Sequence, residues 1–191
     1  NFPDIRSAAE ATIQTIQMGI PVARIEILDC AYIKAINAYS KTSYPEMDTL
    51  FLEFHGTSAG VAEQVQMFDD ISQEFGASGF RWAENEAERT TLWRARHDAY
   101  YAGLAVVPGS RGYVTDVCVP ISRLADCIAE TQQDIADCGL FAPIIGHVGD
   151  GNFHSTVFFD PDDEAMLDKA REYDKRLVKR ALAMGGTCTG E

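Results

Sequence analysis

Two histidines lie close together in a segment whose pattern predicts a β-hairpin. The segment covers residues 146–154 and joins two runs of β-forming residues. Its centre, Asp150-Gly151, is typical of a two-residue type I′ turn, because both central residues of that turn need a positive φ. A turn centred there places His147 directly opposite His154.

This pairing predicts a metal site. Directly opposed residues of a hairpin have Cβ atoms about 5 Å apart, so His147 and His154 could share one ion. Asn152 falls on the same face because side chains alternate along a strand, and Gly149 opposite it leaves room for a ligand. A divalent ion usually needs a third ligand, for which Glu191 is the candidate. The alternative is that both histidines are simply hydrogen-bonded on a half-buried sheet.

Basic residues are sparse, so their positions are informative. The chain has 16 Lys and Arg against 29 Asp and Glu, for a formal net charge of −13. Arg96 shares one face of a predicted helix with Trp93 and Tyr100, and an arginine on an inward face is suited to bidentate binding of a carboxylate. Arg111, just before a predicted strand, is a second candidate. The alternative for both arginines is pairing with acidic residues on the surface.

Alternating helical and extended patterns indicate the fold class. The apolar periodicity, caps and breakers predict helices over 5–19, 29–40, 58–75, 86–105, 121–138 and 163–184, and strands over 22–28, 49–55, 79–84, 112–119, 141–148 and 152–159. This order predicts an α+β sandwich, with a mainly antiparallel sheet and helices on one face. Neither the dinucleotide-binding fingerprint GxGxxG nor the phosphate-binding GxxxxGK[ST] is present.

Composition excludes several classes of protein. With 46% hydrophobic residues in 191, the chain is not disordered, and its acidic balance argues against nucleic-acid binding. Five scattered cysteines without a CxxC pair favour a reducing compartment. No stretch approaches the roughly 20 apolar residues of a membrane span. The chain opens at Asn1 almost directly into a helical pattern and stops after a Gly-rich turn, so we expect a piece of a larger protein.

The motifs together resemble a known family. Residues 146–154, followed by 185–191, are similar to the C-terminal substrate domain of FAD-linked oxidases of the vanillyl-alcohol-oxidase type. Within this family the resemblance is to the D-lactate dehydrogenase (cytochrome) and glycolate oxidase flavin-subunit branch. Residues 92–97 and 115–120 resemble the same branch. The matches span roughly residues 80–191.

The resemblance implies a fold, a reaction and a set of site residues. The fold would be a ferredoxin-like α+β cap over a flavin, with the FAD-binding domain preceding Asn1. The reaction would be the metal-assisted oxidation of a D-2-hydroxy acid such as D-lactate to the 2-oxo acid. The catalytic base would follow Glu191 and lie outside this chain. The implied metal ligands for Zn or Mn are His147, His154 and Glu191, and the implied substrate contacts are Asn152, Arg96 and Arg111.

The resemblance also implies partners. These are a small 2-hydroxy acid, the chain's own N-terminal FAD domain, and an electron acceptor such as a cytochrome, a quinone or an electron-transfer flavoprotein. A homodimer and a cytoplasmic or mitochondrial matrix location, peripheral to the inner membrane, fit the same branch. Two other classes stay open. One is a self-contained metalloenzyme with a two-His-one-carboxylate site, and the other is a sensor domain that binds a small hydroxy acid.

Overall fold

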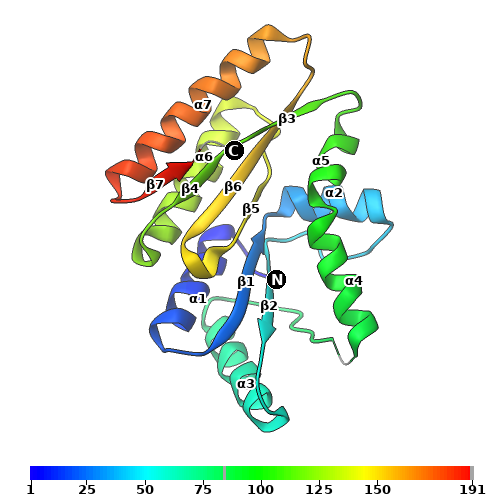
Figure 1. The fold of residues 1–191 in the computed structure, drawn as a ribbon, viewed down its shortest axis with the longest axis vertical. Helices are drawn as coiled ribbons and strands as arrows, with labels where there is room; N and C mark the ends of the chain where they lie inside the picture. Colours follow the sequence, from blue (N-terminus) through cyan, green and yellow to red (C-terminus); the bar gives the residue numbers. More distant parts are fainter. Residues whose placement is uncertain (84, 190–191) are drawn as a thin grey trace.

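The computed structural model describes residues 1–83 and 85–189 of the chain (Figure 1). The helices are α1 Ile5–Gln17, α2 Cys30–Ser40, α3 Ser58–Glu74, α4 Glu86–His97, α5 Ala99–Val106, α6 Leu124–Cys138 and α7 Glu164–Ala183. The strands are β1 Val22–Leu28, β2 Thr49–Phe54, β3 Arg111–Val114, β4 Asp116–Cys118, β5 Ile144–Gly146, β6 Asn152–Phe159 and β7 Thr187–Thr189. Two short 3₁₀ turns are η1 Ile121–Arg123 and η2 Val148–Asp150.

The strands form one antiparallel sheet with β6 near its centre. The order is β2-β1-β5-β6-β4-β7, and β3 also pairs with β6 beyond β4. Every pairing in the described part of the chain is antiparallel. The structure therefore confirms the predicted mixed α+β class with its mainly antiparallel sheet.

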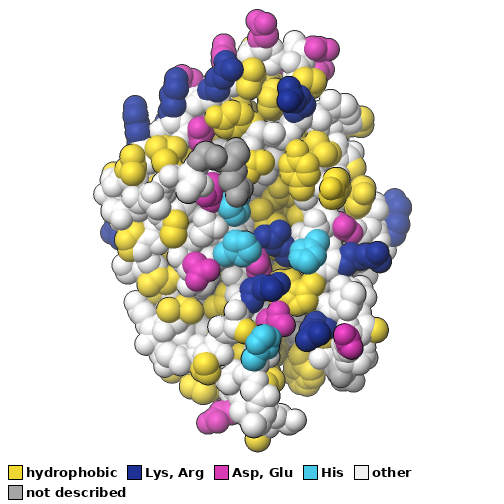
Figure 2. Space-filling view, viewed as in Figure 1, with side chains coloured by type: hydrophobic (Ala, Val, Ile, Leu, Met, Phe, Trp, Pro, Cys, Tyr) yellow, Lys and Arg dark blue, Asp and Glu magenta, His cyan; other side chains and the backbone are white. Residues whose placement is uncertain are grey.

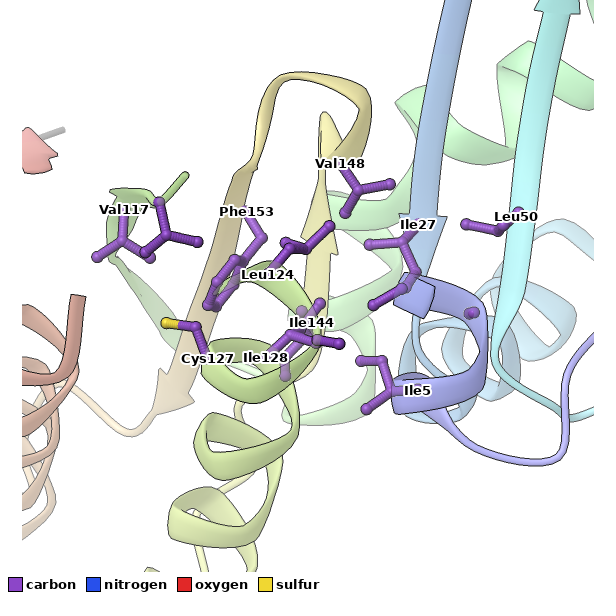
Figure 3. Packing of buried hydrophobic residues seen from close by; sticks show 14 of the residues in the cluster. Ile5, Ile27, Leu50, Val117, Leu124, Cys127, Ile128, Ile144, Val148 and Phe153 are labelled. Atoms are coloured by element: carbon purple, nitrogen blue, oxygen red, sulfur yellow. The ribbon is translucent and has the colours of Figure 1, made fainter. Parts of the chain in front are cut away.

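One face of the sheet carries the larger hydrophobic core. Ile27, Ile144 and Phe153 point to this face and pack against α1, α6 and α7 (Figures 1 and 3). Figure 3 shows Leu124 and Ile128 of α6 directed at these strand residues. Burying such side chains stabilises the fold by roughly 1.5–3 kcal/mol each before chain entropy is counted.

A second, smaller helical layer lies on the opposite face. Leu28, Ile145 and Phe158 alternate with the first set of core residues, and they pack against Tyr32 of α2 and Ala102 of α5. Figure 1 shows α2, α4 and α5 beside β1 and β2. The sequence predicted helices on one face, and this layer adds helices on the other. It leaves the β1–β5–β6–β4 part of that face only partly covered, which is where the candidate site lies.

Several predicted elements differ from the structure. The strand predicted over 141–148 covers only β5, the strand predicted over 112–119 is divided into β3 and β4, and β7 was not predicted. The helix predicted over 86–105 is divided at Asp98, whose N–H bonds to the carbonyls of Arg94 and Arg96 and tightens the last turn of α4. The strand predicted over 79–84 is wrong for residues 79–83, and Glu84 lies outside the described residues. Phe80 packs its ring 6.0 Å from that of Phe68 instead of joining a sheet. No helix in the described ranges is long and apolar enough to cross a membrane.

Candidate functional site

The hairpin at the candidate site has a different register from the predicted one. Ile145 pairs with His154, so the two-residue turn that placed His147 opposite His154 is wrong. The chain turns through η2 instead, with Gly151 at φ +77°. Asn152 N–H donates to the His147 carbonyl at 3.3 Å, which places His147 beside Asn152.

The two imidazoles nevertheless lie side by side. The His147 and His154 ring centroids are 6.1 Å apart, with their planes at 86°. The observed register differs from the predicted one by two residues, because His154 pairs with Ile145 and not with His147. A shift of one residue would move a side chain to the opposite face of the sheet, but a shift of two keeps both histidines on the same face. Asn152 shares the face of His154, as predicted from the alternation along β6.

Glu26 holds His147 from the neighbouring strand. Ile27 of β1 is paired with Gly146, so the preceding Glu26 lies next to His147. Glu26 Oε1 is 2.7 Å from His147 Nδ1, and Glu26 Oε2 accepts from Arg96 Nε at 3.1 Å. The Glu26 side chain is only 3% exposed, so its carboxylate is buried between these two groups.

Asp116 occupies the matching position on the other side of β6. Its Oδ1 is 3.0 Å from His154 Nδ1, although the angle lies outside hydrogen-bond range, and it accepts from Asn152 Nδ2 at 2.7 Å. Asn152 Nδ2 also donates to the Val117 carbonyl at 3.0 Å. Thr189 of β7 donates its hydroxyl to Asp116 as well. Residues of the two neighbouring strands, β6 and β7, therefore fix this carboxylate of β4.

The donor set fits a metal ion in part. Each imidazole turns Nδ1 toward a carboxylate and leaves Nε2 as the atom for a ligand bond, which is the usual arrangement around metal-bound histidine. In the described part of the chain, no group of three or more His, Cys, Asp or Glu is arranged to hold an ion. Glu191, the third predicted ligand, lies outside the described residues.

Arg96 reaches the site from α4, whereas Arg111 does not. The Arg96 side chain is 20% exposed and pairs with Glu26, so the predicted alternative of pairing with surface acids does not describe it. Arg111 pairs in register with Phe159, five residues along β6 from His154, or roughly 17 Å. Phe159 also belongs to the other face of the sheet.

Two hollows adjoin the cluster. A cavity of about 290 Å³ is lined by His147, Gly149 and Ile25, among others, but not by Asn152, which the predicted register had placed opposite Gly149. A groove of about 510 Å³ runs between β1 and α4, where the Arg24 guanidinium lies 4.4 Å from the Trp93 ring centroid. Figure 2 shows histidine, basic and acidic side chains gathered along the middle of this face.

A neutral tyrosine lies beneath the site. Burial raises the pKa of Tyr32 to about 12, and its hydroxyl contacts Thr156 of β6. The phenol therefore stays protonated at neutral pH and contributes no charge under Arg96.

The sequence reasoning missed Glu26 and Asp116. Glu26 stands at an inward position in the otherwise apolar end of the strand Val22–Leu28, and a lone carboxylate in such a position is costly unless it is paired. That pattern was the available indication. Asp116 lies in a motif that carried the family resemblance, but nothing in the local sequence assigned its partners.

Comparison with known proteins identifies the family of the chain. The chain belongs to the family described as "FAD linked oxidases, C-terminal domain", whose profile matches residues 1–191. The family resemblance seen in the motifs is thereby confirmed. Among curated relatives, "Probable D-lactate dehydrogenase, mitochondrial" of Danio rerio is 50% identical over all 191 residues. "D-lactate dehydrogenase [cytochrome], mitochondrial" of Arabidopsis thaliana is 40% identical over the same length.

The match covers only part of those relatives. The chain spans 38% of the Danio rerio protein and 34% of the Arabidopsis thaliana protein. Among solved structures, 4-ethylphenol oxidase from Gulosibacter chungangensis aligns with a TM-score of 0.68 at 14% identity, covering 97% of this chain and 43% of that one. An alkyldihydroxyacetonephosphate synthase aligns at 0.67 and 16%, covering 98% and 39%. At these identities the likeness shows the fold.

Proposed function

We propose that this chain is the substrate-binding half of an FAD-dependent D-2-hydroxy acid dehydrogenase that acts on D-lactate. The observation that carries the proposal is the polar cluster on one partly open sheet face, where two imidazoles, an amide and a guanidinium converge. The names of the relatives at 50% and 40% identity support D-lactate as the substrate. The FAD domain is proposed to precede Asn1.

The described residues can bind and orient a hydroxy acid. Arg96 has its Nε occupied by Glu26, so its terminal nitrogens are the atoms that would bind the substrate carboxylate as charge-assisted donors. Asn152 is held by Asp116 and Val117, which fixes its amide oxygen toward the substrate hydroxyl.

A divalent ion such as Zn or Mn forms the finer part of the proposal. His147 and His154 would hold it through Nε2, with Glu191 as the third ligand. When bound, FAD supplies the hydride acceptor and the metal supplies Lewis-acid polarisation of the substrate hydroxyl. The catalytic base is proposed to follow Glu191. Because three relatives carry "[cytochrome]" in their names, we also propose a cytochrome as the electron acceptor.

The test is turnover by the full-length flavoprotein that contains this chain. D-lactate, L-lactate, glycolate and D-2-hydroxyglutarate are compared with a dye as electron acceptor, with and without chelator. Flavin reduction by D-lactate and its loss in the chelated enzyme are expected. Turnover by the 191-residue chain without flavin would contradict the proposal and support a self-contained metalloenzyme. Hydroxy-acid binding that survives metal removal without any turnover would support a sensor domain.

A further inference from the structure

Glu26 connects two groups that belong to different elements of the molecule. One carboxylate oxygen contacts the imidazole of His147, which follows β5, and the other accepts from the guanidinium of Arg96 on α4. Arg96 and Glu26 are separated by 70 residues in the sequence.

The burial of Glu26 shows that both contacts are needed. An ionised carboxylate transferred from water to a protein interior costs several kcal/mol unless hydrogen bonds and opposite charge compensate it. Glu26 is 3% exposed, and each of its oxygens has its own side-chain partner. A carboxylate that only neutralised Arg96 would form the two-pronged pair that arginine geometry favours, and Arg96 contacts Glu26 through Nε.

We propose that Glu26 is a positioning residue that couples His147 to Arg96, so that the metal-binding and carboxylate-binding groups are oriented together. Glu26 Oε1, 2.7 Å from Nδ1, favours a proton on that nitrogen and leaves Nε2 to bind a metal. The hydrogen bond to Nε sets the rotation of the guanidinium and leaves its terminal nitrogens for a ligand. The inference rests on the proposed function only for the identity of the ligands of His147 and Arg96, a metal ion and a substrate carboxylate.

Glu26→Gln tests whether contact with both partners matters, because it keeps nearly the size of the side chain and removes one acceptor oxygen. The amide has nearly the size of the carboxylate but only one acceptor oxygen, so it cannot accept from His147 and Arg96 together. Glu53 provides the matched control, because it lies on the adjacent strand β2 and is paired with His55 and with two arginines, Arg24 and Arg89. None of these ion pairs of Glu53 involves His147 or Arg96.

The experiment is a pair of double-mutant cycles in the full-length flavoprotein. Glu26→Gln is expected to raise the KM for D-lactate and to weaken metal binding by about 10- to 100-fold, the range typical of outer-shell partners. In an Arg96→Ala background it should raise KM no further, and in a His147→Ala background it should weaken metal binding no further. Glu53→Gln should leave both quantities at the wild-type value.

Additive effects in both backgrounds, or wild-type values in Glu26→Gln, would overturn the coupling. If the wild-type protein binds no metal or oxidises no hydroxy acid, the proposed function fails, and NMR still decides the role of Glu26. The Arg96 Nε–H and His147 Nδ1–H protons should exchange slowly in the wild type, and at least one should lose protection in Glu26→Gln but not in Glu53→Gln. Unchanged protection would refute it.

A second variant covers the case in which Glu26→Gln does not fold. Glu26→Asp keeps the charge and both acceptor oxygens but is shorter by one methylene, so it cannot span both partners. Loss of protection at one of the two protons supports the coupling. Wild-type protection at both overturns it.

Discussion

His147 and His154 meet edge to face, with ring centroids 6.1 Å apart, while Nδ1 of each ring lies 2.7 or 3.0 Å from a different carboxylate. Glu26 approaches from β1 on one side and Asp116 approaches from β4 on the other. Because the two supports are independent, each imidazole can be removed without displacing the other.

His147→Ala and His154→Ala are each expected to weaken metal binding so far that the ion is lost on gel filtration, although titration still measures an affinity, because two remaining ligands hold a divalent ion weakly. Metal content after gel filtration measures this. The two variants should differ in stability, since the His147 side chain is 49% exposed and that of His154 is 17% exposed. His55→Ala, with a 70% exposed ring, is the control. Full metal content in either site variant would contradict the proposed ligands.

Arg96→Lys should raise the KM for the hydroxy acid by about 10- to 100-fold. Lysine keeps the charge but loses the planar fork that binds a carboxylate through two parallel bonds, a difference of roughly 1.5–3 kcal/mol. Steady-state kinetics of the flavoprotein measures it. Arg94→Lys, two residues away on α4, is the control and should stay within about twofold of wild type. An unchanged KM in Arg96→Lys would show that another group binds the carboxylate.

Asp116→Asn should weaken metal binding by about 10- to 100-fold while the fold is kept. The variant removes the negative charge beside His154 Nδ1 but leaves an oxygen that can accept from Asn152. Calorimetric titration with Zn²⁺ gives the affinity. Asp174→Asn, whose carboxylate accepts from Tyr113 on the far face, is the control. Equal Zn²⁺ affinities in the two variants would show that Asp116 does not support metal binding.

Two glycines of the hairpin should respond differently to alanine. A Cβ on Gly146 would overlap the backbone of Phe153 and Asn152, which cannot move without opening the hairpin. A Cβ on Gly149 would lie 3.7 Å from Ile25, an ordinary contact. Gly146→Ala should therefore lower the free energy of unfolding by about 1–3 kcal/mol or more, and Gly149→Ala by less than about 0.5 kcal/mol. Urea unfolding checks both, and equal losses would contradict the observed turn.

Asp29 makes stability depend on pH. It caps α2 by accepting from the Tyr32 N–H at 2.8 Å, and burial, with a smaller contribution from Asp48, raises its pKa to about 7. In the unfolded chain the same group ionises near pH 4. Between about pH 4 and 7 the folded state therefore binds more protons, and the free energy of unfolding falls as pH rises.

Asp29→Asn should remove this dependence, because asparagine caps helices as well as aspartate does. The variant is expected to gain on the order of a few kcal/mol over wild type at pH 8 and little at pH 4. Urea unfolding at both pH values measures the difference. Asp163→Asn replaces the exposed cap of α7 and should shift the unfolding free energy by less than about 1 kcal/mol at both. A gain that is equal at the two pH values would contradict the burial argument.

Local sequence predicted those elements whose ends are set by local chemistry. The strands at Val22–Leu28 and Asn152–Phe159 have the predicted bounds, and α2 begins after its Asp29 cap. Gly139 ends α6 in the left-handed conformation, as a glycine after a helix commonly does. Each of these features depends on residues within one turn or one strand of each other.

The hairpin register could not be predicted because distant residues fix the turn. Val119 N–H donates to the Gly151 carbonyl at 2.9 Å, and a Cβ on Gly151 would overlap the Val119 carbonyl. The turn therefore forms against the end of β4, about 30 residues earlier in the chain. The contact between Glu26 and Arg96 spans 70 residues and was invisible for the same reason. Only the alternation along β6 was local, and it placed Asn152 and His154 on one face, while a register shift of two residues kept His147 on that face.

The alternation of side chains along β6 divides the strand into positions that serve folding and positions that serve the site. Phe153, Ser155 and Val157 are fully buried toward α6 and α7, whereas Asn152 and His154 face the site. A saturation library over the first half of this strand should show a two-residue rhythm, in which alternate codons limit either the amount of folded protein or the turnover per molecule.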